Sequence, residues 1–497
     1  MGIINRRDVL AFILVLAALL VRQFLSPPIW HHGEAREALV VRGIVQHQEW
    51  ILPLRNSELP SKPPFFHWLA ALPALRFGLN DFMVRLPSVI GAEVMAITIF
   101  LLGRAAGGRK VGWLSVGALL GMAGFWNSAS LARVDMVFSA CITVAIAGFF
   151  FWFRDGHKGA RATCYIATTC AVLAKGPAGI VLIGLVIVSF LFTERRLRLL
   201  WSFWSWPLVV FLLFMDLGWY VLAYQLGGED FLEVQLLREN LDRALGTGEF
   251  TFHESPLVVA GWFASRIFPW NLAILWSLIR RLRGTGEDAA GHLLHAWWIS
   301  ILLTFAFAAG KRAVYLLPLF PAIAVLAARA IVDMSARWLS ASASPGSSRD
   351  SVTPLPNRSP VAAISAGIVA FDMIVLLMSS GVWRSVKSWK PRLSVVEQIG
   401  AIVPPHAALF ATPEMENFQL IAIAYRLGRE IERKTLMCAG KNDYFLSPID
   451  SGALSGVEKQ FYLSSGDEYI FLIQMDSGIP AHDDPQCSRK SGEPSPR

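Results

Sequence analysis

The sequence predicts an all-α polytopic membrane protein with about eleven to thirteen transmembrane helices, a cytoplasmic N-terminus and a small periplasmic α/β domain near the C-terminus. Hydrophobic residues make up 54% of the 497 residues and charged residues only 16%, with a mean hydropathy of +0.47. A soluble domain cannot bury that much apolar surface. The apolar residues are also gathered into runs of about 17 to 25, which are long enough to cross roughly 30 Å of hydrocarbon.

The predicted spans follow one another through most of the chain. They are placed at 8–25, 84–103, 111–129, 136–153, 162–175, 177–193, 201–224, 257–279, 293–310, 313–332 and 360–381. Because no small-residue cleavage site follows the first run, we interpret it as a retained helix rather than a signal peptide.

Alternate loops carry short basic clusters, beginning with Arg6 and Arg7 before the first span. Such an excess of lysine and arginine is typical of cytoplasmic loops. The later clusters are Arg104, Arg109 and Lys110, then Arg154, Lys158 and Arg161, then Arg195, Arg196 and Arg198, then Arg280, Arg281 and Arg283. The loops between these clusters are therefore assigned to the periplasm. The net charge of +8 does not indicate a nucleic-acid partner, because it comes from these membrane-orienting clusters.

The chain is predicted to divide into a transmembrane domain over 1–381, a periplasmic α/β domain over 382–475 and a disordered tail over 476–497. The transmembrane domain includes the long periplasmic loops 26–83 and 225–256, and 336–359 is a cytoplasmic linker. The α/β domain is predicted because helix-like stretches alternate with short strand-like ones. The helix-like stretches are 395–402 and 418–427, and the strand-like ones are 407–410, 460–463 and 469–473.

Two acidic residues on the predicted periplasmic side are candidate catalytic groups. Glu34 follows the first span in Glu34-Ala35-Arg36, and a carboxylate beside a cation at a membrane boundary can act as a general base. The alternative is a solvated helix start that favours an acidic residue. Asp135 lies at the edge of an apolar helix in Arg133-Val134-Asp135, where a carboxylate is costly unless it is paired or functional.

Several cations lie in the same predicted loops, against the usual bias for basic residues inside. Their position indicates an anionic ligand. The alternative is that their side chains extend to the membrane interface. These residues are Lys62 before Pro63 and Pro64, Arg85 before Leu86-Pro87-Ser88, Lys175 before Gly176-Pro177, Arg243, and Lys311 with Arg312 before Tyr315-Leu316-Leu317-Pro318. Of the five cysteines, only Cys438 and Cys487 can form a disulfide, and none has metal-ligand spacing.

In their order and their membrane side, these motifs resemble those of the GT-C class of membrane glycosyltransferases. The similarity is to the bacterial relatives of protein O-mannosyltransferase and of the aminoarabinose transferase that modifies lipid A. It covers nearly the whole membrane part of the chain.

The resemblance implies an inner-membrane enzyme that moves a sugar from a polyprenyl phosphate donor, with inversion, to a hydroxyl or phosphate of an envelope acceptor. That acceptor is lipid A, another glycan or a protein. Glu34 or Asp135 would position or deprotonate the acceptor. Cations would stabilise the departing lipid phosphate, and Lys62, Arg243 and Lys311 or Arg312 are expected to do so. The remaining expected substrate-binding residues are Arg36, Arg85, Arg133, Lys175 and Tyr315.

The chain departs from the family pattern at two positions. The family usually has an Asp-Glu pair where this chain has Gly33-Glu34, and often a Glu where Ser61 precedes the lysine. Because fixed cations can neutralise the phosphate, no metal is required. A divalent metal would have His31, His32 and His253 as its candidate ligands.

Two other classes of protein compete with this interpretation. A transporter predicts polar residues near the middle of the spans and an internal repeat. The charges lie almost only at the ends of the spans, with Asp216 as the exception, and no repeat is found. A noncatalytic lipid-binding protein of envelope assembly is the second alternative, and in it the outer carboxylates would be dispensable.

Overall fold

The computed structural model describes residues 5–30, 32–56, 58–242, 254–283, 287–342, 367, 393–415, 417–434, 436, 442–448, 457–465 and 468–475. The predicted tail, Cys438, Cys487 and nearly all of the predicted span 360–381 lie outside this set. The chain forms two compact units. Unit 1 comprises 1–24, 61–66 and 85–380, and unit 2 comprises 25–60, 67–84 and 381–497. The division into domains made from the sequence stays a prediction.

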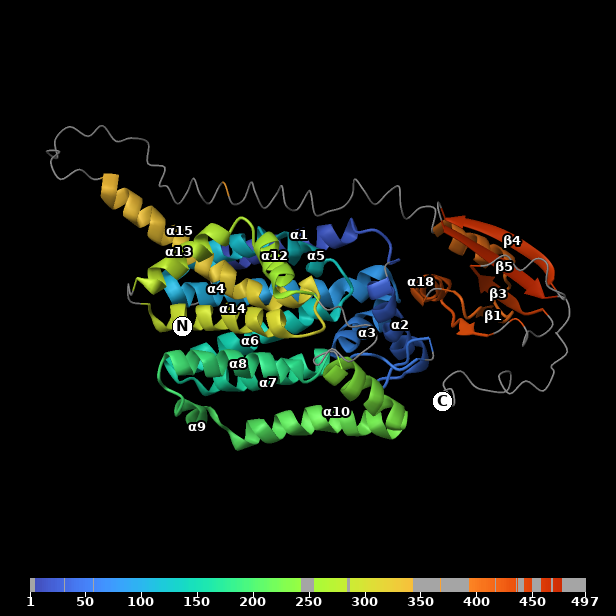
Figure 1. The fold of residues 1–497 in the computed structure, drawn as a ribbon, viewed down its shortest axis with the longest axis horizontal. Helices are drawn as coiled ribbons and strands as arrows, with labels where there is room; N and C mark the ends of the chain where they lie inside the picture. Colours follow the sequence, from blue (N-terminus) through green and yellow to red (C-terminus); the bar gives the residue numbers. More distant parts are fainter. Residues whose placement is uncertain are drawn as a thin grey trace. The chain divides into compact units, whose positions relative to one another are not determined.

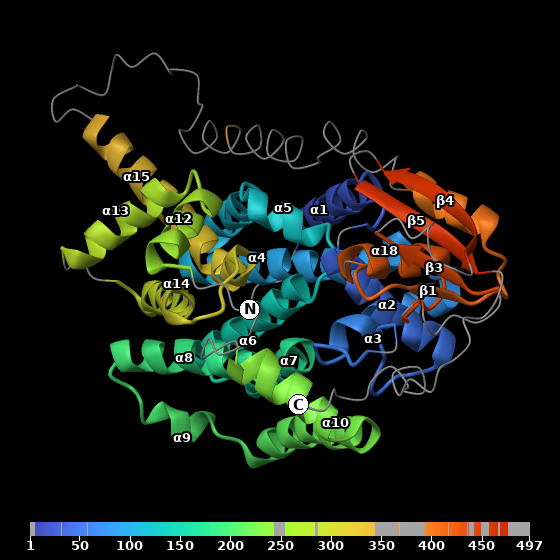
Figure 2. The same cartoon turned by 45° about the vertical axis from the view of Figure 1, so that its right-hand side comes forward.

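Unit 1 is built from helices, and every predicted span from 8–25 to 313–332 falls on helical residues. In Figures 1 and 2, α6, α7 and α8 lie side by side. The helices are α1 (Arg6–Phe24), α4 (Asp81–Leu120), α5 (Ala123–Ala129), α6 (Val134–Asp155), α7 (Lys158–Lys175), α8 (Ala178–Thr193), α9 (Leu199–Phe203), α10 (Trp206–Leu232), η1 (Glu233–Asp242), α12 (Pro256–Arg266), α13 (Asn271–Leu282), α14 (Ala289–Phe307), η2 (Ala313–Leu319) and α15 (Phe320–Ser342).

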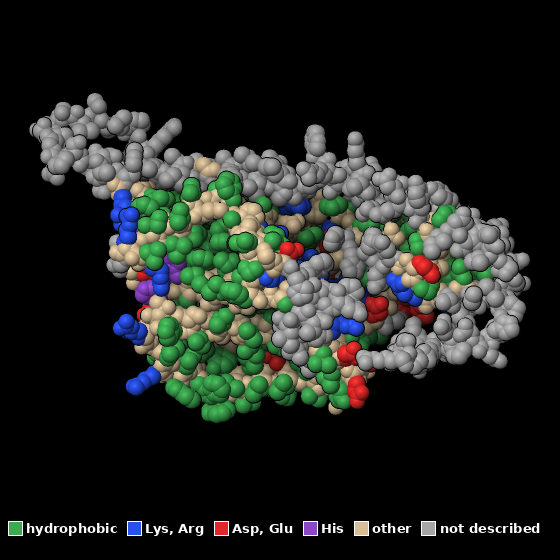
Figure 3. Space-filling view, in the orientation of Figure 1, with side chains coloured by type: hydrophobic (Ala, Val, Ile, Leu, Met, Phe, Trp, Pro, Cys, Tyr) green, Lys and Arg blue, Asp and Glu red, His purple; other side chains and the backbone are tan. Residues whose placement is uncertain are grey.

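The apolar surface of unit 1 agrees with a protein that lies in lipid. Among the described residues, 5 helices are long and apolar enough to cross a membrane, or 6 if one bent pair counts as a single span. Figure 3 shows hydrophobic side chains over most of the visible face of these helices. A mostly helical, multi-pass membrane fold is therefore confirmed. The number of spans and their orientation stay predictions.

Helix α4 is a hairpin of two antiparallel segments. At 40 residues a straight helix would be about 60 Å long, twice the thickness of the hydrocarbon core. The chain reverses at Gly107 and Gly108, where Gly108 has a φ of 85°. After the reversal, a Cβ built on Gly112 would lie 2.8 Å from the backbone oxygen of Phe100. The predicted loop between the second and third spans is this turn.

Three predicted spans are broken in the structure, and the run 201–224 is divided between α9, which ends at Phe203, and α10, which begins at Trp206. The run 257–279 is not one straight helix, because α12 and α13 are bent by 110° at the break between them. Pro269 lies in this break. A proline has no backbone N–H to donate to the preceding turn, so it interrupts a helix. The run 111–129 is divided at Gly121 and Met122 into the end of α4 and the separate helix α5.

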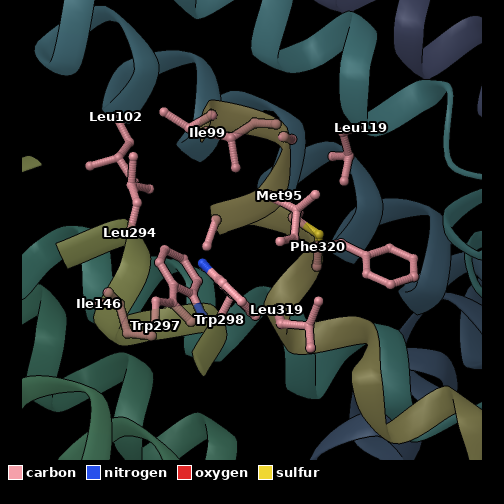
Figure 4. Packing of buried hydrophobic residues seen from close by; sticks show 14 of the residues in the cluster. Met95, Ile99, Leu102, Leu119, Ile146, Leu294, Trp297, Trp298, Leu319 and Phe320 are labelled. Atoms are coloured by element: carbon pink, nitrogen blue, oxygen red, sulfur yellow. The ribbon is translucent and has the colours of Figure 1, made fainter. Parts of the chain in front are cut away.

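The core of unit 1 forms where α4, α6, α14 and α15 meet. Figure 4 shows Met95, Ile99 and Leu294 among the side chains that pack there around Trp297. Trp297 is fully buried, and its Nε1 donates a hydrogen bond to the backbone oxygen of Pro318 at 2.9 Å. This bond satisfies the one polar atom of a large buried side chain. It also ties η2 to α14.

Unit 2 contains the predicted small α/β domain as a mixed five-stranded sheet of order β2-β1-β3-β5-β4. Strand β1 is parallel to β2 and β3, while β5 is antiparallel to β3 and β4. The predicted strand-like stretches fall on β1, β4 and β5, and β2 and β3 were not predicted. The elements are α2 (His32–His47), α3 (Phe65–Phe77), a helix at Leu393–Ile402, β1 (Leu409–Ala411), α18 (Asn417–Leu427), β2 (Glu432–Arg433), β3 (Tyr444–Ser447), β4 (Val457–Ser465) and β5 (Glu468–Met475).

Polar contacts join the first long loop to the C-terminal α/β domain within unit 2. Helices α2 and α18 pack together, and buried Arg42 of α2 donates to the backbone oxygen of Ala424 at 2.8 Å. Arg426 of α18 donates to Asp81 at 2.6 Å. Asn56 donates to the backbone oxygen of Ile431 and accepts from its N–H. Residues almost 400 positions apart therefore form one folded unit.

The turn of α4 gives a test of the fold. We expect Gly112→Ala to destabilise the protein by about 1–3 kcal/mol, because the added methyl group meets the backbone of Phe100 and the two segments must move apart. Thermal unfolding of the purified protein in detergent measures this effect. Gly184→Ala in α8 is the control, since its Cβ would meet nothing within 4 Å. Equal melting temperatures for the two variants would contradict the hairpin.

Candidate functional site

In unit 1, Asp135 lies between two cations at the start of α6. Its side chain is buried, with 5% of the residue exposed. Lys175 Nζ lies 2.5 Å from Asp135 Oδ1, and Arg133 Nε lies 3.5 Å from Oδ2. Each carboxylate oxygen therefore faces a positive charge. The structure brings together three residues that the sequence singled out separately.

The helix ends around Asp135 explain this arrangement. Ser88 Oγ donates to the backbone oxygen of Leu131 at 2.6 Å, which holds the turn before α6. Helix α7 ends at Lys175 because Gly176 adopts a φ of 81° and Pro177 follows it, and proline cannot donate to the preceding turn. Since α6 and α7 pack side by side, the end of one helix delivers Lys175 to the start of the other.

Tyr315 belongs to the same group. Lys175 Nζ lies 4.4 Å from the centroid of the Tyr315 ring and 5.1 Å from that of Phe138. An ammonium group over aromatic faces is attracted by their electron-rich surfaces. The Lys175 side chain is thus surrounded by a carboxylate and two rings, which fixes its position beside Asp135.

The other predicted cations of unit 1 have different surroundings. Lys311 is buried, and its Nζ donates to the backbone oxygen of Ala306 at 2.8 Å. Arg312 is exposed, Lys62 is half-buried and Arg85 is buried. Arg243 lies outside the described residues.

In unit 2, Glu34 and Glu37 of α2 are both buried, with 4% and 3% exposed. Glu37 accepts hydrogen bonds from Arg36 Nη2 at 2.9 Å and has His67 Nε2 2.8 Å from its second oxygen. Burial raises the pKa of Glu37, but the charges and hydrogen bonds of Arg36 and His67 outweigh burial and hold the pKa well below its usual range. Glu37 is therefore a carboxylate whose charged form is favoured by its two partners.

Glu37 and His67 were not among the site residues predicted from the sequence. Glu37 lies three residues after Glu34, so both carboxylates are on one face of α2. Apolar residues at 35, 38 and 39 are buried around them, which marks the face as an interior one. His67 follows Pro63-Pro64-Phe65-Phe66 in the motif that begins at Lys62, and that position is its only signal in the sequence.

Two acidic residues lie in the interior of predicted spans that the structure describes. Asp216 in α10 is 4% exposed, and neither carboxylate oxygen has a hydrogen-bond partner in the described part of the chain. Glu93 in α4 is 8% exposed. The sequence analysis recognised Asp216 as an exception and overlooked Glu93.

Within the described residues, no group of three His, Cys, Asp or Glu side chains could hold a metal ion. His31 and His253 lie outside those residues, as does the side chain of His32. The expectation that no metal is required stays a prediction.

Comparison with protein families gives a match over residues 61–219 to dolichyl-phosphate-mannose-protein mannosyltransferase. Among curated proteins, the chain is 26% identical over 311 residues to an undecaprenyl phosphate-alpha-4-amino-4-deoxy-L-arabinose arabinosyl transferase of Shewanella sediminis, covering 61% of this chain and 56% of that protein. A transferase of the same name from Edwardsiella ictaluri is 26% identical over 335 residues, with 63% and 58% covered. The chain thus spans less than two thirds of the length of these relatives.

Among solved structures, the fold is similar to that of ArnT from Cupriavidus metallidurans bound to undecaprenyl phosphate. The TM-score is 0.76 at 18% identity, and the alignment covers 94% of this chain and 97% of the other. At this identity the likeness establishes the fold. Together, the comparisons confirm that the chain is related to the GT-C class, with the O-mannosyltransferases and aminoarabinose transferases among its relatives.

The paired Glu37 gives a prediction about acid stability. We expect Glu37→Gln to destabilise the protein by about 3–5 kcal/mol at pH 7, because one partner of a buried ion pair is lost. The folded-state pKa is depressed below the ordinary value of 4.5. The stabilisation is therefore present above about pH 4.5 and is lost as the pH falls, so the two proteins should converge in acid. Chemical denaturation at pH 7 and pH 3.5 measures this difference.

Glu58→Gln is the matched control in the same unit. Glu58 pairs with Arg55 but has half of its side chain exposed, so its loss should cost less than about 1 kcal/mol. A Glu37→Gln protein that is no less stable than Glu58→Gln at pH 7 would show that the buried pair does not stabilise unit 2.

Proposed function

We propose that this relative of the GT-C membrane glycosyltransferases transfers a sugar from a polyprenyl phosphate donor to an envelope acceptor on the periplasmic side of the inner membrane. The donor we propose is undecaprenyl phosphate carrying an aminoarabinose-type sugar. The names of the relatives and the ligand of the ArnT structure support this choice. Lipid A is the proposed acceptor, and another glycan or a protein would present the same attacking oxygen.

The observation that carries this proposal is the group formed by Asp135, Lys175, Arg133 and Tyr315. A transfer reaction that releases a lipid phosphate needs a carboxylate next to fixed cations. These four side chains supply the carboxylate and the cations in one place, although they come from segments 40 residues or more apart. The same group contains motifs on which the family resemblance rests.

In the proposed reaction, an oxygen of the acceptor attacks the anomeric carbon while the bond from that carbon to the phosphate oxygen breaks. The configuration at the carbon inverts. When the acceptor is a hydroxyl, its proton passes to the carboxylate of Asp135 or Glu34. The electron pair of the broken bond leaves with the lipid phosphate, whose developing charge is stabilised by Arg133 of this group together with Lys62, Arg243 and Arg312.

The contacts of Lys175 and Lys311 refine their proposed roles. Lys175 is already engaged by Asp135 and two aromatic rings, so we assign it the positioning of that carboxylate. Lys311 donates to a backbone oxygen and is assigned to the support of the Tyr315 segment. Arg36 is likewise engaged by Glu37. Arg85 stays a proposed donor-binding residue.

Replacement of the two carboxylates tests the proposal. The variants Asp135→Asn and Glu34→Gln are compared with the wild type. We expect turnover to fall about 10²–10⁴-fold in the variant that removes the base. The assay measures sugar transfer from a labelled undecaprenyl phosphate donor to lipid A, and donor binding is measured separately. Glu229→Gln, an exposed position of α10, is the control with full activity. Full activity in both test variants would overturn the catalytic assignment and favour a noncatalytic or transport protein.

Metal removal gives a second test. We expect dialysis against EDTA to leave the transfer rate unchanged, because the fixed cations of the site neutralise the leaving phosphate. The rate is compared before and after the addition of Mg²⁺, Mn²⁺ or Zn²⁺ to the dialysed protein. A loss of activity on dialysis that one of these ions restores would contradict the metal-free reaction.

A further inference from the structure

An open pocket of unit 1 lies where the chain leaves α8 and turns through α9 toward α10 (Figures 1 and 2). Its volume is about 990 Å³. The lining combines three arginines, Arg195, Arg196 and Arg198, with the apolar side chains of Phe192, Leu197 and Leu199. Figure 3 shows Lys and Arg side chains at this left-hand end of the helices. None of the lining residues belongs to the Asp135 group, so the pocket is a separate feature.

The lining of this pocket carries a surplus of positive charge. Its three arginines form no ion pair with a carboxylate in the part of the chain that the structure describes. The segment 192–206 has one acidic residue, Glu194, whose Oε1 lies 2.6 Å from His292 Nδ1. Glu287, 4.0 Å from the other nitrogen of His292, is paired with Arg281 at 2.6 Å. Even with Glu194 counted in full, three positive charges of this segment stand against one negative charge.

The neighbouring turn between α6 and α7 adds to this surplus. Arg154 binds both oxygens of Asp155, at 2.8 and 2.7 Å, so this pair cancels. Lys158 and Arg161 follow without a further acidic residue. Arg161 Nη1 donates to the backbone oxygen of Ser202 at 3.2 Å, which places the turn against α9. The anion that this region would attract must therefore come from outside the turn and the segment.

Arg195 has a backbone conformation that favours glycine, with a φ of 55°. Helix α8 ends in a Schellman motif, because the N–H of Arg196 donates to the oxygen of Leu191 at 2.9 Å and the N–H of Arg195 to that of Phe192 at 3.0 Å. The left-handed residue of this motif is usually glycine, since a Cβ is unfavourable there. The chain thus keeps an arginine in the pocket at a cost in backbone conformation.

The segment also presents exposed tryptophans beside the pocket. Trp201, Trp204 and Trp206 are 82%, 46% and 68% exposed. Phe203 between them faces inward, with its ring centroid 4.8 Å from that of Trp152, so α9 is fixed to the helices behind it. Tryptophan is enriched where membrane and water meet. Because the apolar helices α8 and α10 flank the segment, its arginines and tryptophans lie where lipid headgroups begin.

We propose that this pocket binds the phosphate of an anionic phospholipid headgroup, with Arg195 and Arg198 as its donors. A guanidinium group matches phosphate oxygens with two parallel hydrogen bonds. The tryptophans of the segment then contact the upper part of the acyl chains. The sequence assigns this loop to the cytoplasmic side, where anionic lipids of the inner leaflet attract basic segments. The site is independent of the proposed sugar transfer.

The test measures lipid binding to the purified full-length protein in detergent by native mass spectrometry. The probes are phosphatidylglycerol, zwitterionic phosphatidylcholine and water-soluble glycerol phosphate. We expect the wild type to bind phosphatidylglycerol about tenfold more tightly than phosphatidylcholine. The variant Arg195→Gln, Arg198→Gln should lose this preference, because each arginine beside an anionic headgroup contributes about fivefold in affinity. The matched control is Arg6→Gln, Arg7→Gln, which removes the same charge from exposed positions of α1 and should keep the preference.

Arg195→Gly separates lipid binding from stability. Glycine adopts a φ of 55° without strain, so the melting temperature should be no lower than that of the wild type. Phosphatidylglycerol binding should nevertheless be about fivefold weaker. Binding at the level of the wild type in this variant would show that the arginine side chain does not hold the headgroup.

The remaining outcomes also decide the proposal. Equal binding of the two phospholipids by the wild type overturns it, as does an equal loss of preference in the control and in Arg195→Gln, Arg198→Gln. Glycerol phosphate bound as tightly as phosphatidylglycerol would reject the lipid as the source of the phosphate. Trp201→Ala keeps every charge and should weaken both phospholipids alike, about threefold, through lost apolar contact. Unchanged binding of both would contradict the placement of α9 at the headgroups.

Discussion

The ion pair between Asp135 and Lys175 is the interaction on which the arrangement of unit 1 depends most directly. Two charges taken out of water cost several kcal/mol each unless they meet in good geometry, so the ends of α6 and α7 must stay together. The helices can approach because Gly148 faces the backbone oxygen of Ala160, which a Cβ would meet at 2.9 Å. Lys175 then carries the constraint to Tyr315 through the contact with its ring. One buried pair therefore sets the positions of three chain segments.

Unit 2 depends on a different kind of contact, in which arginine side chains bind backbone oxygens. Arg42 donates to Ala424 and Arg429, and Arg426 donates to Ile29 as well as to Asp81. A guanidinium group has five donors in a rigid fork, which lets it satisfy several carbonyls at once. Each bond joins the loop after α1 to the C-terminal α/β domain. The buried carboxylates of α2 therefore lie on a helix whose packing is completed by residues almost 400 positions later.

Hydropathy predicted the positions of the helices because a membrane span needs a long apolar run, and the run is visible residue by residue. Three strands of the α/β domain were predicted from the sequence, but β2 and β3 were missed. Strand β2 has only 2 residues, and the 4 residues of β3 are all buried and show no alternation. The pairing of charges could not be predicted in the same way. Lys175 was assigned to an anionic ligand, yet in the structure it pairs with Asp135, 40 residues away. Glu37 and His67 are 30 residues apart. Spacing along a chain does not encode which distant helix ends meet.

The two ends of unit 1 satisfy their charges differently, and this difference bears on how they can influence each other. At the Asp135 end, both carboxylate oxygens have cationic partners from the chain itself. Near the middle of α15, donors of Arg329 and of Trp276 in α13 have no acceptor in the described part of the chain. The span from η2 into α15 joins these two regions. Within it, 83% of the most apolar stretch of 18 residues is buried. A tightly packed helix transmits no conformational change unless it has a second arrangement to adopt.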